Sequence, residues 1–234
     1  MSEISRPSAG QLAAGIAVVA LALVWPLVSD WLVAELGVRA LASVLLVVSG
    51  LSLFAVRSAV PREFALRRSD SAALVGLIAA AAISGERAFL LLVPAWLQLA
   101  VFRIFRRSVR EGNSVFERVA FAMEPNAPEF IRPYCRTSTL IWSWLFLANA
   151  FAIGALALFA PLAVWRAFTG WIVWAVIAVA SACDYLVRKL HFRAYSANPL
   201  DHLLARFFPP ENTEVGRRSI AYRRDRRLSL GLPP

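Results

Sequence analysis

Apolar runs separated by short charged segments make up most of this 234-residue chain. The runs lie at 11–34, 41–56, 72–84, 88–102, 139–160 and 167–187. A helix that crosses a bilayer needs about 20 apolar residues, and the first, fifth and sixth runs supply them. The third and fourth runs are shorter, so we expect them to form a hairpin about the polar turn from Ser84 to Arg87. The pattern predicts an all-α, polytopic membrane bundle with about six transmembrane helices.

The connector between the fourth and fifth runs, residues 103–137, has a different pattern. Ser114 followed three residues later by Glu117 has the form of a capping box, so a helix should begin there. Its apolar residues recur at helical spacing on one face: Val115, Phe116, Val119, Ala120 and Met123. Glu117 and Glu124 lie opposite, which favours a helix that lies along a surface and ends before Pro125. We therefore predict an amphipathic connector.

The tail beyond the sixth run begins with an apolar stripe at 200–208 and continues as an arginine-rich, polar segment. Such a segment has little to bury, so we expect the tail to be partly disordered. The predicted organisation is a leader at 1–10, a four-span region at 11–102, the connector at 103–137, a two-span hairpin at 138–188 and the tail at 189–234.

Lysine and arginine collect on one side of the predicted bundle. With six crossings, all 25 of these residues except Arg39, Arg87 and Arg166 lie in the leader, the second and fourth connections or the tail. Cytoplasmic segments of membrane proteins are enriched in Lys and Arg, so we expect both termini in the cytoplasm. Composition fits this class, since 59% of the residues are hydrophobic against roughly 45–50% in soluble domains.

The net charge of +10 also raises the question of nucleic acid. Six arginines of the tail could neutralise phosphates: Arg217, Arg218, Arg223, Arg224, Arg226 and Arg227. No aromatic platform or groove-reading motif accompanies them, and next to a membrane each would gain about 1 kcal/mol from anionic headgroups. We expect an anionic-lipid contact and no nucleic-acid partner.

Polar residues inside the last two spans are the candidates for a site, because such groups are costly in a membrane. The candidate lipid or headgroup pocket consists of Tyr134, Arg136, Thr139, Trp142, Asn149, Asp184 and Arg188. In one interpretation, arginines there hold an anionic headgroup or an acyl-carrier phosphate. In the other, Asp184 pairs with Arg188 or Arg136, and Asn149 forms a hydrogen bond between helices.

The sequence contains none of the catalytic motifs that we considered. The two histidines, His191 and His202, begin no HxxxxD motif, and the chain contains no HExxH, GxSxG or Walker sequence. The two cysteines, Cys135 and Cys183, form no CxxC or Cys/His cluster. Catalytic residues are therefore unknown, and we expect neither a metal nor another cofactor.

A set of short motifs resembles a family of small polytopic inner-membrane proteins encoded in aryl-polyene (xanthomonadin- and flexirubin-type) pigment gene clusters of Gram-negative bacteria. The motif residues are Glu117, Arg118, Ala120, Pro125, Pro128, Tyr134, Arg136, Thr139, Trp142 and Asn149, followed by 184–188. The resemblance implies a bacterial inner-membrane location and an accessory role in synthesis or export of a membrane-bound aryl-polyene-type lipid. The protein would handle the lipid intermediate, or dock acyl-carrier or ketosynthase-type cytoplasmic enzymes. Alternatives are a membrane-embedded acyl or glycosyl transferase and a small lipid transporter acting as a homo-oligomer.

Overall fold

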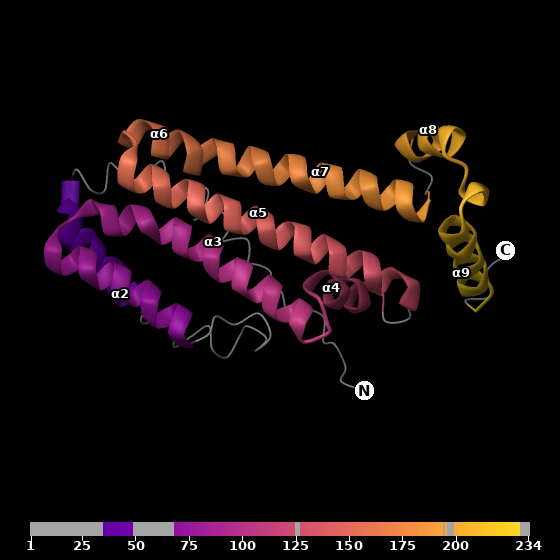
Figure 1. Cartoon of the computed structure of the whole chain (residues 1–234), viewed down its shortest axis with the longest axis horizontal. Coiled ribbons are helices and arrows are strands. Elements are labelled where there is room, and N and C mark those ends of the chain that lie inside the picture. The colour runs from indigo at the N-terminus through magenta and orange to yellow at the C-terminus, as the bar shows by residue number, and fades with distance from the viewer. Residues whose placement is uncertain (1–34, 49–67, 125–126, 194, 196–198, 230–234) are drawn as a thin grey trace. The chain divides into compact units, whose positions relative to one another are not determined.

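The computed structural model describes residues 35–48, 68–124, 127–193, 195 and 199–229, which are helical with short connections and include no strand (Figure 1). The chain divides into two compact units, Met1–Trp174 and Ala175–Pro234. Besides a helix at 35–48, the first unit contains α2 (Arg68–Ser84), α3 (Arg87–Arg110), α4 (Val115–Met123), η1 (Glu129–Ile131), α5 (Arg132–Phe159), α6 (Leu162–Ala167) and the π-helical turn η2 (Phe168–Ile172). Then follow α7 (Val173–Phe192), α8 (Pro199–Phe207), η3 (Pro210–Asn212) and α9 (Glu214–Ser229).

Helices α3 and α5 pack against each other over most of their length (Figure 1). The direction is antiparallel, because early residues of α3 meet late residues of α5. A Cβ on Gly154 would lie 4.0 Å from the Cβ of Ala95, whereas Phe105 near the other end of α3 contacts Phe146, with ring centroids 5.2 Å apart. The buried face of α5 is small or polar: Cys135, Ser138, Thr139, Ser143, Asn149, Ala150 and Ile153. Small residues let membrane helices approach closely.

Helices α2 and α3 form a hairpin, as the sequence predicts. Gly85 has φ +78°, a conformation that favours glycine, and it links Ser84 at the end of α2 to Arg87 at the start of α3. The helix at 35–48 packs on this hairpin through a buried apolar cluster: Leu41, Ala42, Ile78, Ala81 and Leu90. Arg39 donates from Nη2 to the carbonyl of Ser84 at 3.5 Å, so it lies beside the turn.

Three helical segments of the described chain are long and apolar enough to cross a membrane: Arg87–Arg110, Glu129–Phe159 and Leu162–Phe192. Helix α2 is apolar but has 17 residues. The run at 11–34 lies outside the described residues, as do residues 49–56 of the second run. A helical membrane protein is therefore supported, and the number of six spans stays a prediction.

Helix α3 extends eight residues beyond the fourth apolar run and includes part of the predicted connector. Arginine is a good helix former, so the charged residues after Phe102 do not end the helix. It ends where Gly112, at φ +77°, follows the cap residue Glu111. Gly112 donates to the carbonyl of Val109 at 3.3 Å and Asn113 to that of Ser108 at 3.2 Å. Four arginines of the connector consequently lie on a regular helix.

The tail is helical where the sequence predicts partial disorder, since α9 covers Glu214–Ser229. Lys189 forms a 2.7 Å ion pair with the fully buried Asp201 of α8. Arg223 donates to the carbonyl of Tyr195 at 2.6 Å, and the Tyr195 hydroxyl donates to that of Phe208 at 2.8 Å. Burial raises the pKa of Tyr195 above its ordinary value of 10.0. Polar contacts, which hydropathy does not detect, hold this segment, and the partial disorder of the tail stays a prediction.

Candidate functional site

Helix α4 is fastened to α3 and α5 by hydroxyl groups. Ser114 accepts a hydrogen bond from the Glu117 amide at 3.4 Å, which confirms that this residue caps α4. Ser108 of α3 accepts from the Val115 amide at 3.1 Å, and Thr139 of α5 accepts from the Phe116 amide at 3.4 Å. Amides at the start of a helix have no intrahelical partner, so these bonds fix the start of α4 at one end of the α3–α5 pair.

Glu117 was predicted to lie on the polar face of α4, away from the packed side, and this prediction is wrong. Its residue exposure is 5%, whereas Met123 of the predicted apolar face is 83% exposed. Arg132 of α5 donates to Glu117 Oε1 at 2.6 Å. A carboxylate can be buried when a cation and a hydrogen bond compensate its lost hydration, and Arg132 supplies both.

An aromatic cluster fills the junction of α3, α4 and α5. Phe116 contacts Phe105 and Trp142, with centroid distances of 6.0 and 6.1 Å. Phe146 contacts Phe105 at 5.2 Å and Trp142 at 5.9 Å. Trp142 and Thr139 were predicted as pocket residues, but in this structure they connect α4 to α5.

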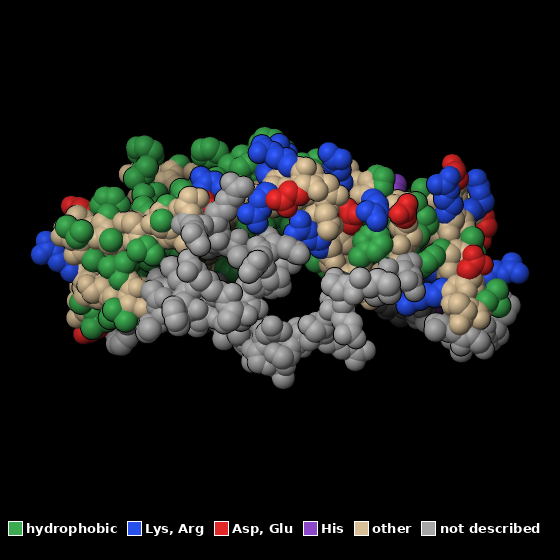
Figure 2. Space-filling view, turned by 90° about the horizontal axis from the view of Figure 1, so that it is seen from below, with side chains coloured by type: hydrophobic (Ala, Val, Ile, Leu, Met, Phe, Trp, Pro, Cys, Tyr) green, Lys and Arg blue, Asp and Glu red, His purple; other side chains and the backbone are tan. Residues whose placement is uncertain are grey.

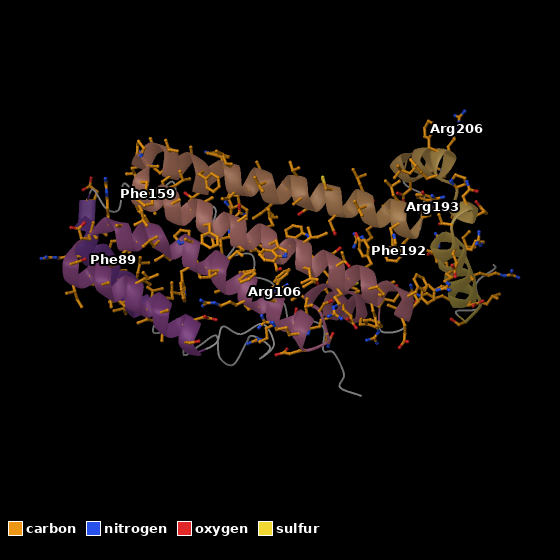
Figure 3. The ribbon with its side chains drawn as sticks, viewed as in Figure 1. Phe89, Arg106, Phe159, Phe192, Arg193 and Arg206 are labelled. Carbon is orange, nitrogen blue, oxygen red and sulfur yellow. The ribbon has the colours of Figure 1, made fainter. Side chains whose placement is uncertain are left out.

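A cavity lies where the start of α2 meets the end of α3. Its volume is about 730 Å³. We name it the arginine pocket after its principal lining residues, which are Asp70, Trp96, Arg103, Arg106, Arg107 and Arg110. Figure 3 shows Arg106 toward the end of α3 that lies away from Phe89. Figure 2 shows Lys and Arg side chains together with acidic ones near the middle of the view.

The wall of the arginine pocket is built around Asp70, which is 4% exposed. Arg103 forms an ion pair with its carboxylate, and Trp96 donates from Nε1 to its main-chain carbonyl at 3.0 Å. The Arg103 guanidinium also lies 4.7 Å from the Trp96 ring centroid. These contacts fix both side chains, and they use Arg103 to compensate a buried charge.

The other three arginines of the pocket differ in their contacts. Arg107 lies 3.6 Å from Glu111, which is half exposed. Arg106 is 5.6 Å from the ring centroid of Trp144. Neither Arg106 nor Arg110 forms an ion pair with another residue of the described ranges. Their positive charge is therefore not balanced within the described part of the pocket.

An apolar groove of about 250 Å³ lies between α2, α3 and α5. Leu77, Leu92, Leu99 and Phe151 contribute to its walls, and Trp96 lines both this groove and the arginine pocket. The indole is therefore next to both a charged compartment and an apolar one. An amphipathic ligand could place its polar end among the arginines and a hydrocarbon chain along the groove.

The predicted pocket residues of α5 lie in different surroundings. Asn149 is 5% exposed and its Nδ2 has no hydrogen-bond partner among the described residues; on the neighbouring helix α3, the buried Gln98 Oε1 also has none. Tyr134 is partly buried and Arg136 is exposed, both in the first turns of α5. Asn149 thus lies within the bundle, whereas Arg136 lies at its end.

Asp184 and Arg188 belong to the second unit, on α7. Asp184 is partly buried, and the Arg188 guanidinium lies 5.8 Å from the Tyr185 ring centroid. The predicted pairing of Asp184 with Arg188 or Arg136 stays a prediction. The meeting of these residues with Arg136 and Asn149 stays a prediction.

Arginines of the tail have contacts within the tail itself. Arg217 donates to the carbonyl of Glu211 at 2.7 Å, Arg218 pairs with Glu214, and Arg223 binds the Tyr195 carbonyl. Arg224 and Arg226 are exposed, and the Arg227 side chain lies outside the described set. The predicted contact with anionic lipid remains a prediction.

The α3 arginines were not predicted as site residues, although a signal was present. Arg103, Arg106, Arg107 and Arg110 follow the i, i+3, i+4, i+7 spacing that places side chains on one helical face. Their partners could not be found this way, because Asp70 is 33 residues from Arg103 along the chain. Among the described residues, no three His, Cys, Asp or Glu side chains come together as metal ligands.

Comparison with known proteins gives no relative. No family model, curated protein or solved structure matches the chain. A function for this chain therefore has to be inferred from the all-helical fold and the geometry of the site.

Proposed function

We propose that this chain is an integral membrane protein that binds an amphipathic lipid, with the headgroup in the arginine pocket and a hydrocarbon chain in the apolar groove. The observation that carries the proposal is the position of Trp96, which lines both compartments. A lipid has the same division into a polar and an apolar end. Arginines suit the polar end because their guanidinium groups bind carboxylate and phosphate oxygens bidentately.

The order of residues along α3 supports this orientation. Leu92 and Leu99 of the groove lie in the apolar part of a helix long enough to cross a membrane, and the arginines follow at its end. Lysine and arginine near helix ends place their charge at the membrane interface. A lipid bound here would therefore keep its headgroup at the interface and its chain at the depth of the hydrocarbon.

We further propose that the lipid is an aryl-polyene-type product or intermediate and that the protein is an accessory to its synthesis or export at the bacterial inner membrane. This step rests on the motif resemblance. The motif residues Glu117, Thr139 and Trp142 build the α3–α4–α5 junction, which contains Phe105 from the same end of α3 as the pocket. The motif would then act by positioning the arginines, with acyl-carrier or ketosynthase-type enzymes as cytoplasmic partners.

A strain that lacks the gene tests this proposal through its lipid extract. Loss of the polyene chromophore would support a role in synthesis, and its retention in the inner membrane would support a role in export. An unchanged extract would contradict the aryl-polyene function. Complementation with Arg106→Gln/Arg110→Gln should fail at normal protein level, whereas Arg87→Gln, an exposed arginine at the other end of α3, should complement fully.

A further inference from the structure

We infer that the headgroup held by the arginine pocket is a phosphate monoester, carried on a single hydrocarbon chain that enters the apolar groove. This inference rests on the proposed lipid-binding function and adds the chemical class of the ligand. Three properties of the described residues carry it: the charge balance of the pocket, the fixed orientation of two guanidinium groups and the size of the groove.

The charge balance favours a dianion. Among the described residues that line the pocket, four arginines stand against two acids, Asp70 and Glu111. The lining therefore has an excess of two positive charges. A phosphate monoester carries about −1.5 to −2 at neutral pH, which matches this excess, whereas a carboxylate or a phosphodiester carries a single negative charge.

The acids already occupy two of the arginines, so the ligand would engage the others. Asp70 is paired with Arg103, and Glu111 lies 3.6 Å from Arg107 and 3.3 Å from Arg118, which is outside the pocket lining. Arg106 and Arg110 are one helical turn apart on α3, so their side chains lie on the same face. Two adjacent guanidinium groups can each donate two hydrogen bonds, and a phosphate monoester offers three terminal oxygens to accept them.

Aromatic contacts restrict the orientation of the guanidinium groups. Arg103 lies over the ring of Trp96 at 4.7 Å, and Arg106 lies near that of Trp144 at 5.6 Å. A guanidinium that stacks on a ring by its face keeps its N–H groups in the plane, where they can bind oxygen. For Arg106, which would bind the headgroup, this contact reduces the entropy lost on binding.

The size of the groove limits the apolar part of the ligand. Its volume of about 250 Å³ is below the roughly 300–1,000 Å³ of common small-molecule sites. Leu99 and Phe151 line it from two different helices. It has room for a segment of one hydrocarbon chain beside Trp96.

Binding of matched probes to the purified full-length chain in neutral detergent tests the inference. The probes are dodecyl phosphate, its methyl ester, dodecanoate and inorganic phosphate, measured by isothermal titration calorimetry. We expect dodecyl phosphate to bind about tenfold more tightly than its singly charged methyl ester and dodecanoate, because it makes additional charge-assisted bonds. Inorganic phosphate, which has no chain for the groove, should bind more weakly still.

Variants assign this preference to the pocket. Arg106→Gln/Arg110→Gln should reduce the affinity for dodecyl phosphate to that for dodecanoate. Arg106→Lys, which keeps the charge and removes the planar fork, should give an intermediate affinity, and Arg87→Gln should leave the affinity unchanged. The melting temperature of each variant in detergent is measured as well. A lower affinity is assigned to the pocket only when the variant melts at the wild-type temperature, so that loss of folding is not read as loss of binding.

The outcomes separate this inference from the proposed function. Equal affinity for the three alkyl anions would overturn the phosphate-monoester class and leave lipid binding in place. Inorganic phosphate binding as tightly as dodecyl phosphate would show that the ligand is free phosphate, and would overturn the role of the groove. If no alkyl probe binds, both the inference and the proposed lipid-binding function fail.

Discussion

Arg132 on α5 donates to the carboxylate of Glu117 on α4 at 2.6 Å, and the exposure of the two side chains differs greatly, at 48% for Arg132 and 6% for Glu117. The pair therefore consists of a buried anion and a cation that reaches water. Removing Arg132 should therefore have a different effect from removing Glu117, because water can hydrate a lone Arg132 but not a buried, lone Glu117.

The first prediction concerns this asymmetry. Arg132→Gln leaves the Glu117 carboxylate buried without its cation, and breaking a buried pair in this way costs about 3–5 kcal/mol. Glu117→Gln leaves an arginine that water can solvate, so we expect a smaller loss of about 1–3 kcal/mol. The free energy of unfolding in detergent measures both.

Glu129 supplies the control for this comparison. It lies 3.7 Å from the same arginine, and its side chain is 87% exposed. Exposed ion pairs contribute about 0–1 kcal/mol, so Glu129→Gln should be nearly neutral. Equal losses for the Glu117 and Glu129 variants would show that α4 does not pack as described.

The second prediction separates two kinds of arginine in the pocket. Arg103→Gln leaves the buried Asp70 without its partner, and we expect about 3–5 kcal/mol of destabilisation. Arg110 is exposed and has no ion-pair partner among the described residues, so Arg110→Gln should change stability by less than about 0.5 kcal/mol. Thermal melting of the two variants and the wild-type protein measures both changes in stability. A large loss of stability for Arg110→Gln would mean that Arg110 is structural.

The third prediction concerns the folded tail. Asp201 is completely buried beside Lys189, so Asp201→Asn should weaken the link between α7 and α8 by removing the counter-charge. The exposed Glu211→Gln serves as its control. Limited trypsin digestion, which requires local unfolding, should cleave α9 several times faster in the first variant and at the wild-type rate in the second. Rapid cleavage of α9 in the wild-type protein would support the disordered tail that the sequence predicts.

The fourth prediction is the topology derived from the distribution of lysine and arginine. Reporter fusions near Arg87 and Arg166 should register outside the cytoplasm, and fusions after Arg193 should register inside it. The contact of Arg39 with the turn at Ser84 fits this assignment, because both were predicted on the outer side. An outer location for the C-terminus would contradict the assignment.

Local signals in the sequence predicted part of this structure. The cap at Ser114 and the turn at Gly85 depend on residues within one helical turn, so both could be found without the fold. The burial of Glu117 could not, because it depends on Arg132, which is 15 residues away. Thr139 and Asn149 are buried as their helical phase suggests, and Thr139 accepts a hydrogen bond from the Phe116 amide of α4.

The arginine pocket illustrates what the sequence alone leaves out. The spacing of the α3 arginines places them on one face, but Asp70 and Trp96 join them only because α2 folds back on α3. The folded tail has a similar cause, since arginine side chains bind main-chain carbonyls there. Hydropathy treats both arginine groups alike, as charges outside the membrane.

The amount of lipid that the purified chain retains tests the central claim most directly. After extraction in neutral detergent, mass spectrometry would quantify bound lipid per chain for the wild-type protein, Arg106→Gln/Arg110→Gln and Phe151→Asn. Arg87→Gln is the control for the pocket. Phe159→Asn is the control for the groove, since Phe151 and Phe159 are both exposed on α5 and only Phe151 lines the groove.

The account predicts that the wild-type protein and both controls retain the same lipid. The pocket variant should lose about tenfold or more of it, because bonds to charged groups contribute about 1.5–3 kcal/mol and 1.4 kcal/mol changes affinity tenfold. The groove variant should also lose lipid, because it removes apolar surface that the hydrocarbon chain would cover. Undiminished lipid in the pocket variant, or loss in that variant without loss in Phe151→Asn, would contradict the claim that the arginine pocket and the apolar groove hold one lipid.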